Sequence, residues 1–98
     1  MKKTVFHPDA QTEMTEAAIY YESLQQNLGK RFLASVKDSI HRVQINPVLY
    51  PVIELDVRRC LVRPFPFGVM YRDMPGKIIV VAVMHLHREP GYWKDRKN

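Results

Sequence analysis

One run of apolar residues constrains the fold of this chain more than any other feature of its sequence. Residues 78–84 read IIVVAVM, with mostly β-branched side chains and no charge. Such a run, directly after the turn sequence DMPGK, is typical of a buried β-strand. Because no polar residue alternates along it, we expect this strand to lie centrally in a sheet, covered on both faces or by neighbours on both sides.

Two amphipathic helices are predicted in the first half of the chain. KTVF (3–6) reads as a short strand, after which Pro8 and Asp9 open a helix, since proline is tolerated in a first turn and an acid is favourable there. Gly29 is expected to end this helix, and Asn46-Pro47 the second one. The apolar stripes of the two helices are Met14, Ala17, Ala18, Tyr21, Leu24 and Leu28, then Phe32, Leu33, Val36, Ile40 and Val43. We expect Tyr20, Tyr21 and Leu24 to pack inside an antiparallel helical hairpin.

Strands dominate the second half of the chain. The loop NPVLYPVIE (46–54) contains two prolines, which exclude a regular element there, and strands are predicted within VRRCLVRPF, FGVMYRD and GKIIVVAVMHLH. The element order is then β-α-α-β-β-β, with a short turn or helix at EPGYWKDR. We expect one domain over residues 1–98 with an α+β fold, a helical hairpin packed on an antiparallel β-sheet. The other face of the sheet is then solvated or is a binding surface.

Composition excludes several classes of protein. The first residues, MKKTVFHPDA, have no apolar core of a signal peptide, and no other apolar run reaches the length of a membrane span. Cys60 is the only cysteine, so no intramolecular disulfide is possible and a reducing cytoplasm is the expected compartment. We expect its thiol to be buried in a strand rather than reactive.

The charges of the chain are unevenly distributed. The net charge is +5, and residues 50–98 carry nine basic against five acidic residues. The basic members of the segment 57–72 are Arg58, Arg59, Arg63 and Arg72, and the acidic members of the segment 9–22 are Asp9, Glu13, Glu16 and Glu22. This separation favours an acidic partner, either nucleic acid or an acidic protein segment. The alternative is that the two patches meet each other.

Polar side chains gather in VMHLHREPGYW (83–93), directly after the central strand. His85 and His87 would share a face of a strand, but no further ligand has a recognisable spacing, so we expect no metal. Cleavage of RNA is the chemistry these residues permit: His85, His87 and Tyr92 as proton donors and acceptors, with arginines on the phosphate. Those arginines are Arg59, Arg63 and Arg88. Trp93 is expected to pack, as an anchor that turns the C-terminal segment back onto the domain.

Three stretches together resemble the RelE/ParE superfamily of toxins from type II toxin–antitoxin systems. They are AAIYYESLQQNLGKRFLASVKDSIHRVQINPVLYP, VRRCLVRPFPFGVMYR and IIVVAVMHLHREPGYWKDR, and they cover nearly the whole chain. The resemblance is most specific in the basic strand leading through Phe-Pro-aromatic to a Tyr, and in the closing His-Arg-x-Pro-x-Tyr-Trp. The order of elements in this family matches the order predicted above.

The resemblance implies a bacterial or archaeal cytoplasmic protein without a cofactor. Its partner would be a cognate antitoxin that wraps around it, and operator DNA would be contacted only through that antitoxin. The basic strand face is a plausible dock for an acidic antitoxin segment, and an exposed sheet edge can accept an added strand. The residues expected to bind the target or the antitoxin are Arg59, Arg63, Tyr71, Arg72, His87, Arg88, Tyr92, Trp93 and Arg96.

Two targets divide this superfamily, and the sequence resembles the branch that inhibits DNA gyrase. RelE-like members cut mRNA on the ribosome and commonly carry basic residues where this chain has Leu61 and Gly68. The remaining catalytic candidates, His85, His87, Arg88, Tyr92 and Arg59, form an incomplete set. The alternatives are therefore a ribosome-dependent endoribonuclease and a non-toxic protein-binding member of the same fold.

Overall fold

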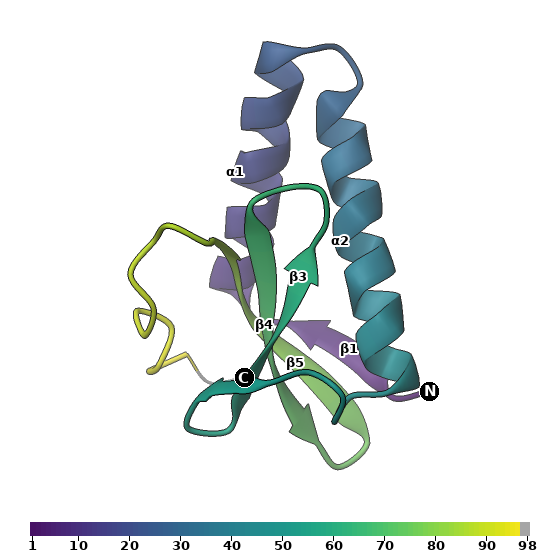
Figure 1. Ribbon diagram of the computed structural model, residues 1–98, viewed down its shortest axis with the longest axis vertical. Helices are drawn as coiled ribbons and strands as arrows, with labels where there is room; N and C mark the ends of the chain where they lie inside the picture. The colour runs from purple at the N-terminus through teal and green to yellow at the C-terminus, as the bar shows by residue number, and fades with distance from the viewer. Residues whose placement is uncertain (97–98) are drawn as a thin grey trace.

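The computed structural model describes residues 1–96 and consists of a helical hairpin on a five-stranded sheet (Figure 1). The elements are β1 (Lys3–Phe6), α1 (Pro8–Leu24), α2 (Leu28–Ile45), β2 (Val52–Glu54), β3 (Val57–Val62), β4 (Phe67–Met74) and β5 (Lys77–His85). The strand order is β1-β5-β4-β3-β2, and all pairings are antiparallel except that of β1 with β5. The α+β class and the helical hairpin are confirmed.

The apolar run forms an interior strand of the sheet, with neighbours on both sides, as predicted. β5 lies between β1 and β4, and its residues from Ile78 to Met84 are all buried. β1 joins β5 in parallel, with Lys3 opposite Lys77 and Phe6 opposite Val80. A strand with neighbours on both sides and cover on both faces has no position for a polar side chain, which explains the run.

The helical hairpin begins and turns through specific local contacts. Pro8 occupies the first turn of α1, where the Nδ1 atom of His7 accepts a hydrogen bond from the backbone N–H of Asp9. Asn27, with a φ of 71°, makes the turn in the left-handed conformation. The prediction that Gly29 ends the first helix is wrong, because α1 ends at Leu24 and Gly29 lies in the first turn of α2. Its role is close packing, since a Cβ atom there would lie 2.4 Å from the carbonyl oxygen of Ala18.

The far end of the hairpin projects beyond the sheet (Figure 1). For this reason two residues expected to pack inside it, Tyr20 and Leu24, are exposed, while Tyr21 packs against Phe32 and Phe65. The hairpin covers one face of the sheet, where Val36, Val62, Val69, Val80 and Val83 join these aromatic rings in the main core.

The opposite face of the sheet is also covered. Val57, Met70, Val81, Ala82 and Met84 form a second apolar cluster there, which is closed by Trp93 from the C-terminal segment. That segment makes turns at Gly91 and Trp93 rather than a helix, which agrees with the predicted terminal turn. The sheet therefore leaves neither face fully open to solvent.

The loop expected between the helices and the strands contains a short strand. β2 spans Val52–Glu54 and pairs with Val57 and Arg58 of β3, so the prediction that prolines exclude a regular element there is wrong for these three residues. Pro47 and Pro51 both precede the strand, and an edge strand can begin directly after a proline. No helix in the described residues is long and apolar enough to cross a membrane.

Candidate functional site

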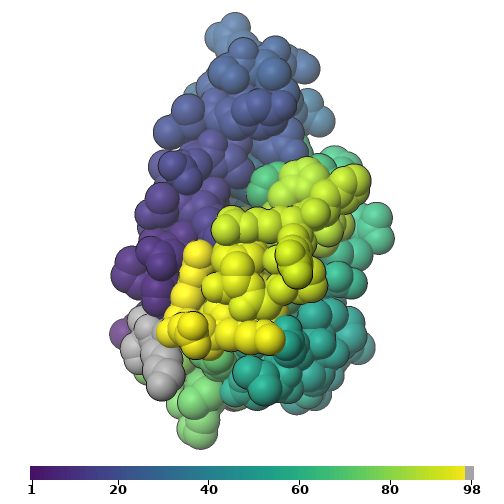
Figure 2. Space-filling model, turned by 90° about the vertical axis from the view of Figure 1, so that its left-hand side faces the viewer, coloured from purple at the N-terminus to yellow at the C-terminus, as the bar shows by residue number. Residues whose placement is uncertain are grey.

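The C-terminal segment, residues 86–96, forms one candidate surface of the molecule. In Figure 2 this segment lies across the middle of one side, between α1 and the region of β2 and β3. Trp93 is wholly buried beneath it. Its expected packing role is thereby confirmed, and in this conformation its ring offers nothing to a binding partner. Lys94 holds the segment from the other side through an ion pair with Glu54, 2.6 Å between Nζ and Oε1.

Glu13 of α1 fixes the segment from the helical side. Its Oε1 atom accepts hydrogen bonds from the backbone N–H of Val83 at 3.1 Å and from Nη1 of Arg96 at 2.9 Å. Its Oε2 atom lies 3.5 Å from Nη1 of Arg88. The guanidinium of Arg96 also donates to the carbonyl oxygen of Val81 at 3.0 Å. Part of the predicted acidic patch is thus neutralised by arginines of the C-terminal segment.

The acidic and basic patches do not pair with each other in this structure. Glu22 instead accepts the backbone N–H groups of Asn27 and Gly29 at the hairpin turn. Arg58 donates to the carbonyl oxygen of Tyr50 at 2.6 Å, and Arg72 pairs with Asp56 at 3.0 Å. Two members of the basic segment therefore hold the β2–β3 region together.

Tyr92 is partly buried, and its hydroxyl oxygen is shielded from solvent. The guanidinium of Arg88 lies 3.5 Å from the centre of its ring, and that of Arg96 lies 5.0 Å away. Burial, and secondarily the carboxylate of Glu13, raise the pKa of the Tyr92 hydroxyl well above its usual range. A buried phenol with a raised pKa is a poor source of a catalytic proton or of its conjugate base at neutral pH.

The two histidines stand together at the end of β5. The rings of His85 and His87 are 5.1 Å apart, and Nδ1 of His85 accepts the backbone N–H of His87. His85 also packs edge-on against Phe67, while His87 is exposed. Within residues 1–96 no group of three His, Cys, Asp or Glu side chains is placed to hold a metal ion.

Tyr71 does not lie on the surface where a partner was expected to find it. Its side chain is fully buried, and its hydroxyl donates to the carbonyl oxygen of Pro47 at 2.5 Å. Burial raises the pKa of this hydroxyl well above its usual range. The residue ties β4 to the loop after α2, so a role in binding would require the fold to open.

Within the described residues, none of the arginines of β3 and its end, Arg58, Arg59 and Arg63, has an acidic partner. Arg58 donates to backbone carbonyl oxygens of the loop before β2. The aliphatic part of Arg59 crosses β4 at Gly68, where an added Cβ would lie 3.0 Å from its Cγ. The absence of a side chain at Gly68 thus makes room for Arg59. Arg59 and Arg63 line a pocket of about 240 Å³, which is completed by Arg42, Tyr50, Pro51 and Leu61.

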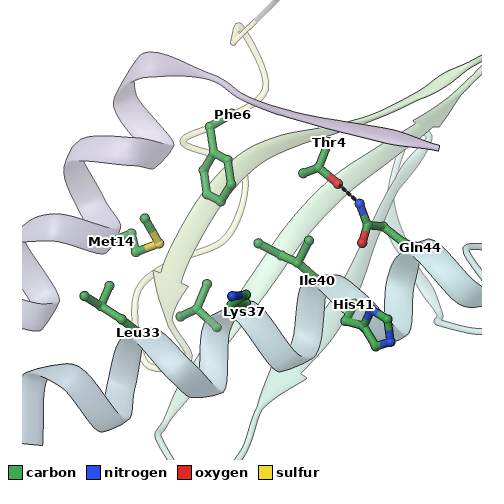
Figure 3. Close-up of a pocket in the computed structure, with 9 residues that line it drawn as sticks. Thr4, Phe6, Met14, Leu33, Lys37, Ile40, His41 and Gln44 are labelled. Atoms are coloured by element: carbon green, nitrogen blue, oxygen red, sulfur yellow. Dashed lines mark hydrogen bonds between the residues drawn. The ribbon is translucent and has the colours of Figure 1, made fainter. Parts of the chain in front are cut away.

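A second candidate surface, which the sequence did not predict, is an apolar groove along the helical hairpin. One part, about 420 Å³, lies between β1, α1 and α2; Figure 3 shows Phe6, Met14, Leu33 and Ile40 around it. Gln44 donates to Thr4 at 2.8 Å and closes one end. A second part of about 400 Å³ continues between the helices and shares Met14 and Leu33. We call these two parts the hairpin groove.

Sequence reasoning missed the contributions of Glu13 and Arg42 because both depend on tertiary packing. Glu13 precedes Met14 of the apolar stripe, and this proximity to the buried face of α1 was the available signal. Arg42 donates to the carbonyl oxygen of Leu61 across the gap between α2 and β3. No pattern within α2 itself indicates that contact.

These surfaces lie on a small α+β protein in which a helical hairpin packs on a five-stranded sheet. Residues 4–90 match the model of the family described as "ParE toxin of type II toxin-antitoxin system, parDE". The chain belongs to the ParE toxin family. No curated protein sequence gives a significant match.

A solved structure supports the same fold. The chain is similar to a protein of the chromosomal ParDE toxin–antitoxin system from P. aeruginosa, with a TM-score of 0.62. The two share 15% sequence identity, and the alignment covers 87% of this chain and 96% of the other. The expectation of a RelE/ParE-like fold is confirmed, and membership of the family implies a cognate antitoxin as partner.

Proposed function

We propose that this protein is a toxin that inhibits DNA gyrase and that its cognate antitoxin neutralises it. The observation that carries the proposal is the match of residues 4–90 to the ParE toxin family, the gyrase-inhibiting branch of the superfamily. The proposal places the protein in the cytoplasm, with operator DNA contacted through the antitoxin. Inhibition requires binding only, so the target surface needs exposed side chains on a rigid support rather than a set of catalytic groups.

The geometry around Tyr92 supports a binding role over catalysis. Of the candidate catalytic residues, Tyr92 is partly buried with its hydroxyl out of contact with solvent, and Arg88 is stacked on its ring and pairs with Glu13. His87 and the outer part of Arg88 are the exposed members of this set. They lie in the loop 86–90, at the end of the buried strand β5, and we assign this loop to contact with gyrase.

Cleavage of mRNA on the ribosome is the second candidate function. The observation that favours it is the pair of adjacent imidazoles, His85 and His87, which are 5.1 Å apart near Arg88. Such a pair can supply one base and one acid for cleavage of a phosphodiester. The two candidate functions therefore share His87 but differ in whether His85 is needed.

The decisive experiment is titration of the protein into purified gyrase acting on relaxed plasmid, with and without the antitoxin. We expect dose-dependent loss of supercoiling that the antitoxin reverses. His87→Ala combined with Arg88→Ala should weaken inhibition by about tenfold or more, the effect of losing contacts at the centre of an interface. Arg31→Ala, an exposed arginine on α2, is the matched control and should leave inhibition unchanged.

Two outcomes would contradict the proposal. The first is undiminished supercoiling at large molar excess of folded protein. The second is codon-dependent mRNA breakage in a cell-free translation reaction that disappears in His85→Ala, which would place the protein in the ribonuclease branch. Trp93→Ala is unsuitable as a probe of either target, because removing this wholly buried ring opens the second apolar cluster.

A further inference from the structure

The hairpin groove leaves large aliphatic side chains in contact with solvent. Ile19 of α1 and Leu33 of α2 line it from opposite sides, and these residues are 65% and 40% exposed. Neighbouring exposed apolar side chains of this kind commonly mark a protein interface. The far end of the hairpin extends beyond the sheet (Figure 1), which leaves room for a second pair of helices beside it.

The two sides of the groove carry opposite charges. Glu16 lies one turn before Ile19 on α1, and Lys37 lies one turn after Leu33 on α2. Lys37 lines the groove itself (Figure 3), and Lys30 lines the part nearer to the hairpin turn. These three charged side chains are exposed, and none of them forms an ion pair within residues 1–96. The α1 side is therefore acidic where the α2 side is basic.

These residues are placed symmetrically about the turn of the hairpin. Ile19 lies five residues before the last residue of α1, and Leu33 lies five residues after the first residue of α2. Glu16 lies eight residues before the same end of α1, and Lys37 lies nine residues after the start of α2. Because both helices rise by about 1.5 Å per residue, Ile19 is level with Leu33, and Glu16 is nearly level with Lys37.

We propose that two copies of this chain associate through their hairpin grooves into a four-helix bundle, with α1 of each copy against α2 of the other. A two-fold axis parallel to the helices exchanges the acidic and basic sides of the groove. Ile19 of each copy then meets Leu33 of the other, and Glu16 meets Lys37. The four aliphatic side chains form one apolar layer, flanked by two ion pairs. Every helix has antiparallel neighbours, as in common four-helix bundles.

The distribution of charge selects this orientation. A two-fold axis perpendicular to the helices would place α2 against α2. Centred near Leu33, it would bring Lys30 of one copy to Lys37 of the other, and like charges at an interface are unfavourable.

The same charges favour a second copy over a single helix of another protein. A single helix laid in the groove would need opposite charges along its two edges, whereas a second hairpin supplies both at matching heights. No residue of the segment 86–96 lines the groove. The inference therefore goes beyond the proposed function, and it holds whether or not the loop 86–90 contacts gyrase.

Sedimentation equilibrium of the full-length protein without antitoxin tests the proposal. Two helices from each copy make a small interface, so we expect a reversible dimer with a dissociation constant of about 10–100 μM. Ile19→Asp should weaken it by about a hundredfold, because a charge enters the apolar layer twice. Tyr20→Asp changes the neighbouring exposed residue, which does not line the groove, and should leave the dimer unchanged. Circular dichroism confirms that both variants are folded.

Reversal of the charges tests the orientation. Glu16→Lys and Lys37→Glu change the net charge in opposite directions, yet each should weaken the dimer by about tenfold, because each creates two like-charge pairs. Both substitutions in one chain recreate opposite pairs at the parent's net charge and should restore the parent's dissociation constant. Arg31→Glu makes the same charge change as Lys37→Glu outside the groove and should have no effect.

Three results would overturn the proposal. One is a protein that remains monomeric at about 1 mM, far above the expected dissociation constant. Another is a dimer that persists in Ile19→Asp, which would show that the copies meet through a different surface. The last is a double charge reversal that fails to restore association, which would contradict the contact of α1 with α2. None of these measurements involves gyrase, so their outcome is separate from that of the supercoiling assay.

Discussion

Glu13 joins α1, β5 and the C-terminal segment. Its side chain is 13% exposed, and it contacts a backbone N–H and two arginines. A carboxylate this far from water is stable only when such partners compensate its lost hydration. The fixed position of residues 86–96 therefore depends on an acid that lies near the other end of the chain.

Replacement of Glu13 by glutamine should loosen the C-terminal segment. Arg96, with a side chain 15% exposed, would lose its charged partner at 2.9 Å, and we expect a loss of about 1–3 kcal/mol of unfolding free energy. Urea unfolding followed by Trp93 fluorescence measures it. Glu16→Gln makes the same chemical change at an exposed position of α1 and is the control. Its unfolding free energy should equal that of the unmodified protein. Equal stability of the Glu13 and Glu16 variants would contradict the role assigned to Glu13.

Tyr71 and Tyr92 should make stability sensitive to alkaline pH. Burial is the main cause that raises the pKa of both hydroxyls above the ordinary value of 10.0. The unfolded chain then loses these protons at a lower pH than the folded one. The stabilisation is therefore complete below about pH 10 and declines above it.

Urea midpoints measured from about pH 8 to about pH 11 test this dependence on the two buried phenols. We expect Tyr92→Phe to reduce the decline of the midpoint above pH 10. Tyr71→Phe should reduce it as well, although it also lowers stability at every pH because the bond to Pro47 is lost. Tyr20→Phe changes an exposed ring and should leave the profile as it is. Parallel profiles for all four proteins would disprove the assignment.

At the scale of elements, the sequence predicts what local patterns encode. Burial along one element leaves a pattern in its own residues, as in the run from Ile78 to Met84 and the apolar stripe of α2. The type and position of these two elements could therefore be inferred from the sequence. β2 could not, because three residues carry no period, and its existence depends on pairing with β3. Gly29 was misread as a helix end because close packing and chain termination both select glycine.

Gly29→Ala tests the contact between the two helices. An added Cβ would lie 2.4 Å from the backbone oxygen of Ala18, so the helices must separate. We expect a net loss of about 1–3 kcal/mol in unfolding free energy, despite the better helix propensity of alanine. Thermal denaturation followed by circular dichroism measures it. The neighbouring Lys30→Ala, at an exposed position, is the control, and a more stable Gly29→Ala would show that the helices are not in such close contact.

At the scale of the whole molecule, the sequence predicts several residues of the candidate site but not how they are arranged in space. The exposed position of His87 and the packing of Trp93 agree with what single residue types suggest. The ion pair between Glu13 and Arg96 joins residues 83 positions apart, which come together only in the folded molecule. Tyr71 and Tyr92 were expected at a binding surface because the sequence reveals residue type but not which side of a strand or turn is covered.

Cys60 offers a measure of the integrity of the whole fold. Its thiol is fully buried between α2 and β3, and burial raises the pKa of that thiol. We expect a thiol-reactive dye to label the native protein at least a hundredfold more slowly than the urea-unfolded chain, because labelling requires opening of the core. Rapid labelling of native protein would show that the helical hairpin separates from the sheet far more readily than its packing implies.

The parallel pairing of β1 with β5 has a consequence for how the protein is made. Lys3 leaves the ribosome early, but its partner, Lys77, is added only after both helices and three other strands. Because non-local strand pairs form late and domains are synthesised from the N-terminus, the sheet cannot close on a nascent chain. A protein built this way completes its sheet only when translation is nearly finished, so a chain terminated before Lys77 cannot form the parallel pair.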